Sequence, residues 1–231
     1  MEGCDINQVD CAGNTPLVWA AWNGHEGVVE ILLGRDGVDP EMANPFRQTP
    51  LCFAAENGHE GVVKILLGRG DVNAQKRTLM RETPLFLAAG NGHDGVVRIL
   101  LGRDDVDPDT PCFMGRTPLC HASDRGHRGV VEILLERDDV NPNKPDDKGR
   151  TPLSRALQEG HAGVVALLQP LASSTPGTSP VPEVTVSPTT LNPWDNNLHA
   201  TSAKTTLTPQ TRPPPPLPPS SYSRTISSYI S

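Results

Sequence analysis

The chain has 231 residues, a net charge of −7 at pH 7 and only 4% aromatic residues. The negative charge argues against nucleic acid or an anionic membrane surface as a partner, and no apolar run reaches the length of a membrane span. Five cysteines without framework spacing are typical of reduced thiols, so we expect a soluble intracellular protein, cytoplasmic or nuclear.

The chain repeats itself in steps of 34 residues. We term residues related by these steps a column and name each column after its first member. Chance does not keep several motifs in phase over five copies, so the sequence predicts an array of five units. The motif TPL begins at Thr15, Thr49, Thr83, Thr117 and Thr151, GH at Gly24, Gly58, Gly92, Gly126 and Gly160, and GVV at Gly27, Gly61, Gly95, Gly129 and Gly163.

Each unit opens with a predicted short helix. Thr15 is a good N-cap, and Pro16 stands at the first helical position, where its missing N–H costs nothing. Leu17, Ala20 and Ala21 form an apolar stripe, and the alanines allow a neighbouring unit to approach closely. We expect Gly24 to end this helix in the left-handed conformation.

A second helix is predicted from about Glu26, with Val28, Val29, Leu32 and Leu33 at helical spacing. The segment that follows is rich in Asp, Pro and Gly, as in RDDVNPNKPDDKGR at residues 137–150, which indicates an extended loop or a β-turn finger. Helices of eight or nine residues are unstable alone in water, so neighbouring units must supply the core.

One stretch resembles a chemical site. Cys120, His121, Asp124 and His127 lie close together in sequence and have the side chains of a zinc site or a nucleophile–base pair. Three of them stand in columns that hold unrelated residues in other units, and only His127 belongs to a constant column. We therefore interpret the cluster as a coincidence of columns, predict a backbone hydrogen bond near the inter-helix turn for the constant histidine, and expect no metal or cofactor.

The order TPL, AA, GH, VV, LL and DVN resembles ankyrin repeats over roughly residues 5–168, and the near-identity of the copies is most like fungal-type arrays. The resemblance implies an all-α fold, a solenoid of stacked antiparallel helix pairs with β-turn fingers, over residues 1–169. The family histidine after TPL is replaced here by Val18, Cys52, Phe86, Cys120 and Ser154.

Fingers and first helices line a concave groove in ankyrin arrays, and the variable columns choose the partner. Aromatic and Met residues in otherwise polar columns favour binding over neutral drift. Trp22 in particular is expected to lie in water without a packing role. The predicted groove residues are Trp19, Trp22, Phe46, Arg47, Gln48, Phe53, Glu56, Met80, Glu82, Phe113, Met114, Arg116, His121, Asp124 and Arg125, with Leu79 at a finger tip.

Residues 170–231 differ in composition, since Pro, Ser and Thr fill 35 of these 62 positions. Such a segment buries too little apolar surface to offset its ordering entropy, so we predict a disordered tail. Within it, Arg212, Pro215 and Pro218 fit the R-x-x-P-x-x-P pattern of a polyproline II ligand for an SH3-like or WW-like domain. A plain stiff spacer is the alternative interpretation of the same residues.

Three hypotheses about function remain open at this point. The leading one is a non-catalytic scaffold or adaptor that binds a protein partner through the ankyrin groove. The second is the recognition arm, or a relative, of a larger ankyrin-containing sensor. An enzyme with an unrecognised site is the third, although phosphate loops, HExxH motifs and nucleophile elbows are all missing from the sequence.

Overall fold

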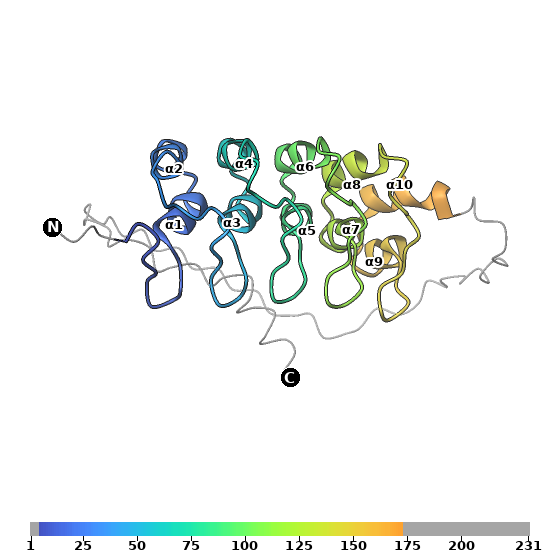
Figure 1. Cartoon of the computed structure of the whole chain (residues 1–231). Coiled ribbons are helices and arrows are strands. Elements are labelled where there is room, and N and C mark those ends of the chain that lie inside the picture. Colours follow the sequence, from blue (N-terminus) through green and yellow to red (C-terminus); the bar gives the residue numbers. More distant parts are fainter. Residues whose placement is uncertain (1–4, 173–231) are drawn as a thin grey trace, which may run out of the picture. The chain divides into compact units, whose positions relative to one another are not determined.

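The computed structural model describes residues 5–172, and these residues form ten α-helices and no β-strand. Figure 1 shows the helices as two rows, one of first helices and one of second helices. The first helices are α1 (Pro16–Trp22), α3 (Pro50–Glu56), α5 (Pro84–Asn91), α7 (Pro118–Arg125) and α9 (Pro152–Gln158). The second helices are α2 (Glu26–Leu33), α4 (Glu60–Leu67), α6 (Asp94–Leu101), α8 (Arg128–Leu135) and α10 (Ala162–Ala172).

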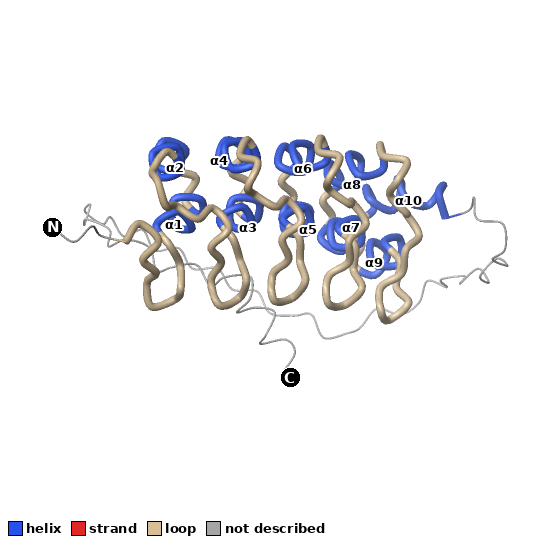
Figure 2. Tube along the Cα trace, viewed as in Figure 1, coloured by secondary structure: helices blue, strands red, loops and turns tan. Residues whose placement is uncertain are grey.

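Each first helix packs against the next first helix, and each second helix against the next second helix. The connections between successive helix pairs project beyond the row of first helices, on the side away from the second helices, as long finger loops (Figure 2). The predicted solenoid of helix pairs with fingers is therefore confirmed over the described residues.

The capping chemistry that the sequence predicts is present in every unit. The hydroxyl of each TPL threonine accepts a hydrogen bond from the backbone N–H three residues later. In the first unit Val18 N donates to Thr15 Oγ1 (3.2 Å), and in the last unit Ser154 N donates to Thr151 Oγ1 (3.2 Å). Gly24 follows α1 with a φ of 72°, in the left-handed region as expected. The threonine, the proline after it and this glycine thus fix both ends of the first helix.

The core runs through the whole array without interruption. The Leu17 and Ala21 columns are buried in the inner units, with Leu85 and Ala89 both 0% exposed. Ser123 replaces alanine in the Ala21 column, where its hydroxyl donates to the carbonyl of Leu119 (2.7 Å) and it remains fully buried. A small side chain in this column lets the next first helix approach closely.

Two polar columns link a unit to the unit before it, the histidine in units 2 to 5 and the arginine in units 2 to 4. The ring Nε2–H of the constant histidine donates to the carbonyl of the Trp22 column in the preceding unit, as in His59 to Trp22 (2.8 Å) and His161 to Asp124 (3.1 Å). The arginine after the second helix donates to the last carbonyl of the preceding second helix, as in Arg69 to Leu33 (2.9 Å). The predicted structural role of the histidine column is confirmed for four of its members, His59, His93, His127 and His161.

The last helix runs past residue 169, where the sequence analysis placed the end of the repeat domain. Helix α10 continues through Pro170 to Ala172, and the Leu171 carbonyl accepts a hydrogen bond from Asn143 Nδ2 (3.4 Å). Proline removes one N–H but does not stop the helix here. The remaining predictions for the tail, including the motif of Arg212, Pro215 and Pro218, lie outside the described residues. Among residues 5–172, no helix has the length and apolar character needed to cross a membrane.

Candidate binding surface on the finger tips

The finger tips are shaped by one column of short polar side chains. Asn44 Oδ1 accepts the backbone N–H groups of Phe46 and Gln48 (3.0 Å each), and Asp146 Oδ1 accepts those of Lys148 and Arg150 (2.9 Å each). Side-chain acceptors that hold the backbone N–H groups of a turn fix its conformation. The tips are therefore defined turns rather than irregular loops.

The residue at each tip adopts a left-handed backbone. Glycine takes this position in three fingers, as Gly13, Gly115 and Gly149, with φ values of 81°, 71° and 74°. Arg47 and Arg81 take it in the other two, each with a φ of 61°. The left-handed region disfavours side chains with a Cβ, so both arginines are held in strained positions, which occur most often at functional sites.

Backbone hydrogen bonds join neighbouring fingers at their tips. Leu79 N donates to Phe46 O (2.8 Å), and Phe113 N donates to Met80 O (2.9 Å). The corresponding position in the second finger is Pro45, which has no N–H, so the first and second fingers cannot form this bond. Asp147 N donates to Met114 O (3.2 Å) in the same way, so units 2 to 5 hold their tips at a fixed spacing.

Large apolar side chains stand exposed on these joined tips. Phe46, Leu79 and Phe113 are 43%, 56% and 64% exposed, whereas Met80 and Met114 are half-buried. Arg47 and Arg81 are exposed beside them, and neither guanidinium has an ion-pair partner within residues 5–172. We term this surface the finger-tip row, and it consists of Phe46, Arg47, Leu79, Met80, Arg81, Phe113 and Met114.

Sequence reasoning found all of the finger-tip row except Arg81. The signal for Arg81 was present, since its column holds Gly13, Gly115 and Gly149. An arginine where three sister units have glycine indicates a left-handed position occupied at a cost. The same signal marks Arg47, which was selected for its place at the tip.

The first helices use their variable columns mainly to contact one another. Trp22 lies between Trp19 and Phe53, with ring centroids 5.3 and 4.9 Å away and interplanar angles of 11°. The expectation that Trp22 has no packing role is therefore wrong, because the next unit supplies an aromatic ring for it. Phe53 and Gln48 are 3% and 2% exposed, so their placement on the partner-binding surface is also wrong.

His121 belongs to a second contact of this kind. Its ring packs on Phe86 (centroids 4.5 Å apart) and covers Gly90, where an added Cβ would collide with the ring. Burial, together with the nearby Arg125 and Arg116, lowers the pKa of His121 to about 3. The imidazole is neutral at pH 7 and packs between units 3 and 4, while the residue as a whole is half-buried.

Ion pairs replace the aromatic contacts between units 4 and 5. The guanidinium of Arg155 donates to Asp124 (2.9 Å) and to Asp146 (3.1 Å) and is itself 5% exposed. Arg116 lies 3.5 Å from Asp124, and both side chains are largely buried, at 17% and 16% exposure. Arg125 of α7 is exposed. The predicted groove residues Glu56 and Glu82, which belong to units 2 and 3, are half-buried.

Asp146 is the most perturbed carboxylate of this network. Its burial favours the neutral form, but the backbone N–H and the guanidinium of Arg150 and the backbone N–H of Lys148 outweigh that effect. The pKa of Asp146 falls to about 2 as a result. The carboxylate is therefore charged at neutral pH and acts as a structural anchor for the last finger.

Cys120, His121 and His127, which resembled a chemical site in the sequence, each have a separate packing role in the structure. Burial raises the pKa of the Cys120 thiol to about 11, so it remains protonated and unreactive at neutral pH. The Nε2–H of His127 donates to the Gly90 carbonyl (3.0 Å), in the preceding unit. No group of three metal-ligand side chains converges anywhere in residues 5–172.

Comparison with protein families agrees with this repeat geometry. A family model described as ankyrin repeats in three copies matches residues 35–112 and 104–175. A second model, described as the ankyrin repeat, matches residues 12–45. A comparison with curated proteins gave no match.

Proposed function

Because the chain belongs to the ankyrin repeat family, whose repeats are generally modules for binding other proteins, we propose that it is a non-catalytic scaffold or adaptor. Its partner contacts the finger-tip row. The observation that carries this proposal is the set of three exposed apolar side chains, Phe46, Leu79 and Phe113, on tips that are joined by hydrogen bonds. Solvent-exposed apolar groups on a rigid support are typical of interaction surfaces.

The two strained arginines indicate the chemistry of the partner. Arg47 and Arg81 flank the exposed apolar side chains of units 2 and 3, and both guanidiniums are free to form ion pairs. A segment that carries apolar side chains next to carboxylates fits this surface best, since arginine donates in pairs to a carboxylate. The array supplies the positive charges although the whole chain has a net charge of −7.

Cross-linking capture with the full chain tests the proposal. A variant with Phe46→Ser, Leu79→Ser and Phe113→Ser should keep the fold, because these side chains are exposed, and should lose the captured partners by at least about tenfold. Leu157→Ser is the matched control, since Leu157 is 59% exposed but lies in α9, remote from the tips. Equal capture by the wild-type chain and the triple variant would place the binding surface elsewhere.

The proline-rich motif is a separate proposal, and it rests on sequence alone. If Arg212, Pro215 and Pro218 form a polyproline II ligand, the full chain should bind an isolated SH3 or WW domain, and Arg212→Ala should weaken that binding. Binding that ignores this substitution would favour the spacer interpretation. The finger-tip variants should leave the result unchanged.

A further inference from the structure

The finger-tip row covers the three middle fingers of the array. Each tip presents one residue of the Cys11 column and one of the Ala12 column. These residues are small in the first finger, Cys11 and Ala12, and charged in the fifth, Asp147 and Lys148. In units 2 to 4 they are apolar, namely Pro45 with Phe46, Leu79 with Met80, and Phe113 with Met114. A partner therefore meets three apolar tips in succession, one in each unit.

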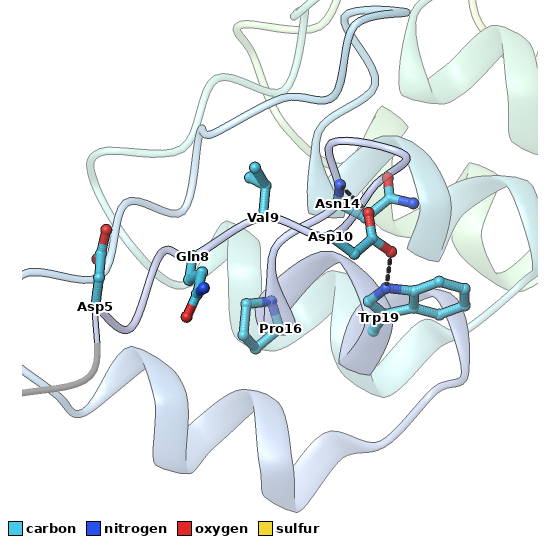
Figure 3. Close-up of a pocket in the computed structure, with 7 residues that line it drawn as sticks. All are labelled: Asp5, Gln8, Val9, Asp10, Asn14, Pro16 and Trp19. Atoms are coloured by element: carbon cyan, nitrogen blue, oxygen red, sulfur yellow. Dashed lines mark hydrogen bonds between the residues drawn. The ribbon is translucent and has the colours of Figure 1, made fainter.

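The first finger is held by its own unit and is not joined to the row. Asp10 Oδ1 accepts the backbone N–H groups of Ala12 and Asn14 (2.9 Å each), and Asp10 Oδ2 accepts Trp19 Nε1–H (2.8 Å). Figure 3 shows the bond between Asp10 and Trp19 beside a shallow hollow on unit 1. Pro45 has no N–H with which to bond the first tip. The series of joined tips thus begins at unit 2.

The bonds between the tips limit the distance from one unit to the next. Leu79 N lies 2.8 Å from Phe46 O, and the chain continues to Met80 O, the equivalent of Phe46 O one unit later. Because two residues span at most about 7 Å, the two carbonyl oxygens lie no more than about 10 Å apart. The first helices pack on one another, and packed helices have axes about 8–10 Å apart. Equivalent tip residues therefore recur at intervals of about 8–10 Å.

Few backbone conformations place side chains on one face at this interval. In an α-helix, residues seven apart share a face and lie about 10.5 Å apart, while residues three or four apart lie about 5–6 Å apart. In a β-strand, the side chains of one face recur at about 6.6 Å. A polyproline II helix has three residues per turn and a rise of about 3.1 Å, so every third side chain faces the same way at about 9.3 Å. Only this last value falls within the interval of the row.

We propose that the partner binds the finger-tip row through a polyproline II segment, an inference that rests on the function proposed above. Every third residue of the segment is apolar over three successive turns, and each of these residues contacts one tip of units 2 to 4. Carboxylates on a second edge of the segment pair with Arg47 and Arg81, which directly follow Phe46 and Met80. Gly115 takes this position in unit 4, so the apolar residue at that tip needs no carboxylate beside it.

This conformation also suits the small size of the contact. Phe46, Leu79 and Phe113 are the large apolar side chains that the row exposes. Ordering a flexible segment on binding costs free energy, and a small interface offsets little of that cost. A proline-containing segment is already extended before it binds, so less order has to be imposed on it.

Synthetic peptides test the spacing, with the full chain as receptor and fluorescence anisotropy as the measurement. The probe is a labelled peptide of four Leu-Pro-Glu triplets, in which each leucine is restricted by the proline after it and the leucines recur at about 9.3 Å. The matched control consists of four Leu-Pro-Glu-Ser quartets, whose leucines recur at about 12 Å and do not share a face. The triplet peptide should bind at least about tenfold more tightly than the quartet peptide, and Leu79→Ser should remove this difference.

The two arginines give a second readout with the same probe. Arg47→Gln combined with Arg81→Gln should weaken the binding of the triplet peptide several-fold and reduce its dependence on salt. Arg77→Gln is the matched control, since Arg77 is exposed in the same finger as Arg81 but precedes the tip. An unchanged affinity in the double variant would overturn the pairing of carboxylates with Arg47 and Arg81.

A third peptide represents the α-helical alternative, with leucine at every seventh position among Ala, Glu and Lys. Tighter binding of this helical peptide, equal binding of the triplet and quartet peptides, or no binding of the triplet peptide would overturn the polyproline II assignment. The capture experiment described above separates this failure from that of the proposed function. If the variant with Phe46→Ser, Leu79→Ser and Phe113→Ser loses its partners while the triplet peptide does not bind, the row remains the binding surface and only the conformation of the segment is wrong.

Discussion

Gly90 controls the contact between units 3 and 4, because the ring of His121 covers it. Alanine is normally the better residue inside a helix by about 1 kcal/mol, but here its Cβ would collide with the imidazole. Gly90→Ala should therefore lower the free energy of unfolding in urea. In the His121→Ala background the same substitution should raise it, and an equal effect in both backgrounds would contradict this account.

The strained finger tips give a second prediction at the residue scale. Arg47→Gly and Arg81→Gly should each raise the free energy of unfolding by about 1 kcal/mol, because glycine adopts the left-handed region without steric cost. Arg77→Gly is the matched control, since Arg77 is also an exposed finger arginine but has no positive φ. A gain at Arg77 as large as at Arg47 would show that strain is not the cause.

The half-buried imidazole of His121 makes the free energy of unfolding depend on pH. Its pKa is about 3 in the folded chain and near 6.5 when unfolded, so the unfolded state binds the extra proton between these values. The free energy of unfolding should fall as the pH drops from 6.5 towards 3. Urea titrations at pH 7 and pH 4.5 check this, and His121→Leu should reduce the fall between the two pH values by about 2 kcal/mol. The same fall in the variant would exclude His121 as its source.

At the scale of helices, the stack of Trp19, Trp22 and Phe53 joins α1 to α3. Trp22→Ala removes the middle ring, so we expect a loss of about 2 kcal/mol in the free energy of unfolding. Phe113→Ala, at a 64% exposed finger residue, should change it by less than about 0.5 kcal/mol. Thermal denaturation of both variants is sufficient, and similar Tm values for the two would contradict the packing role of Trp22.

The end of α10 can be tested by two truncations of the chain. Ending the chain after Gln169 removes Leu171, whose carbonyl accepts the Asn143 side chain, whereas ending it after Ala172 keeps the whole helix. The shorter chain should have the lower Tm, because it loses the final turn. Equal Tm values would mean that residues 170–172 contribute nothing to the stability of the last unit.

For the whole molecule, sequence periodicity was sufficient to predict the helices, their caps and the histidine bonds, because each depends on a motif that recurs five times. The columns of Trp19 and Trp22 could not be interpreted this way. Their meaning lies in pairs formed across neighbouring units, such as Trp22 with Phe53, Gly90 with His121 and Asp124 with Arg155. The residues within one column were compared with each other in the sequence analysis. In the structure, a residue of the Trp22 column contacts a residue of the Trp19 column in the next unit.

These pairs also restrict how the gene for such an array can change. Nearly identical repeats invite recombination that deletes or duplicates a unit in frame. Loss of residues 107–140, which are unit 4, would place Gly90 opposite Arg155 and leave a buried guanidinium without the carboxylate of Asp124. Arg155 would keep Asp146 (3.1 Å) but lose the other of its two carboxylates, and removing one partner of a buried ion pair is destabilising. The contacts between neighbouring units thus constrain the order of the units, although the repeated motifs within the units are nearly identical.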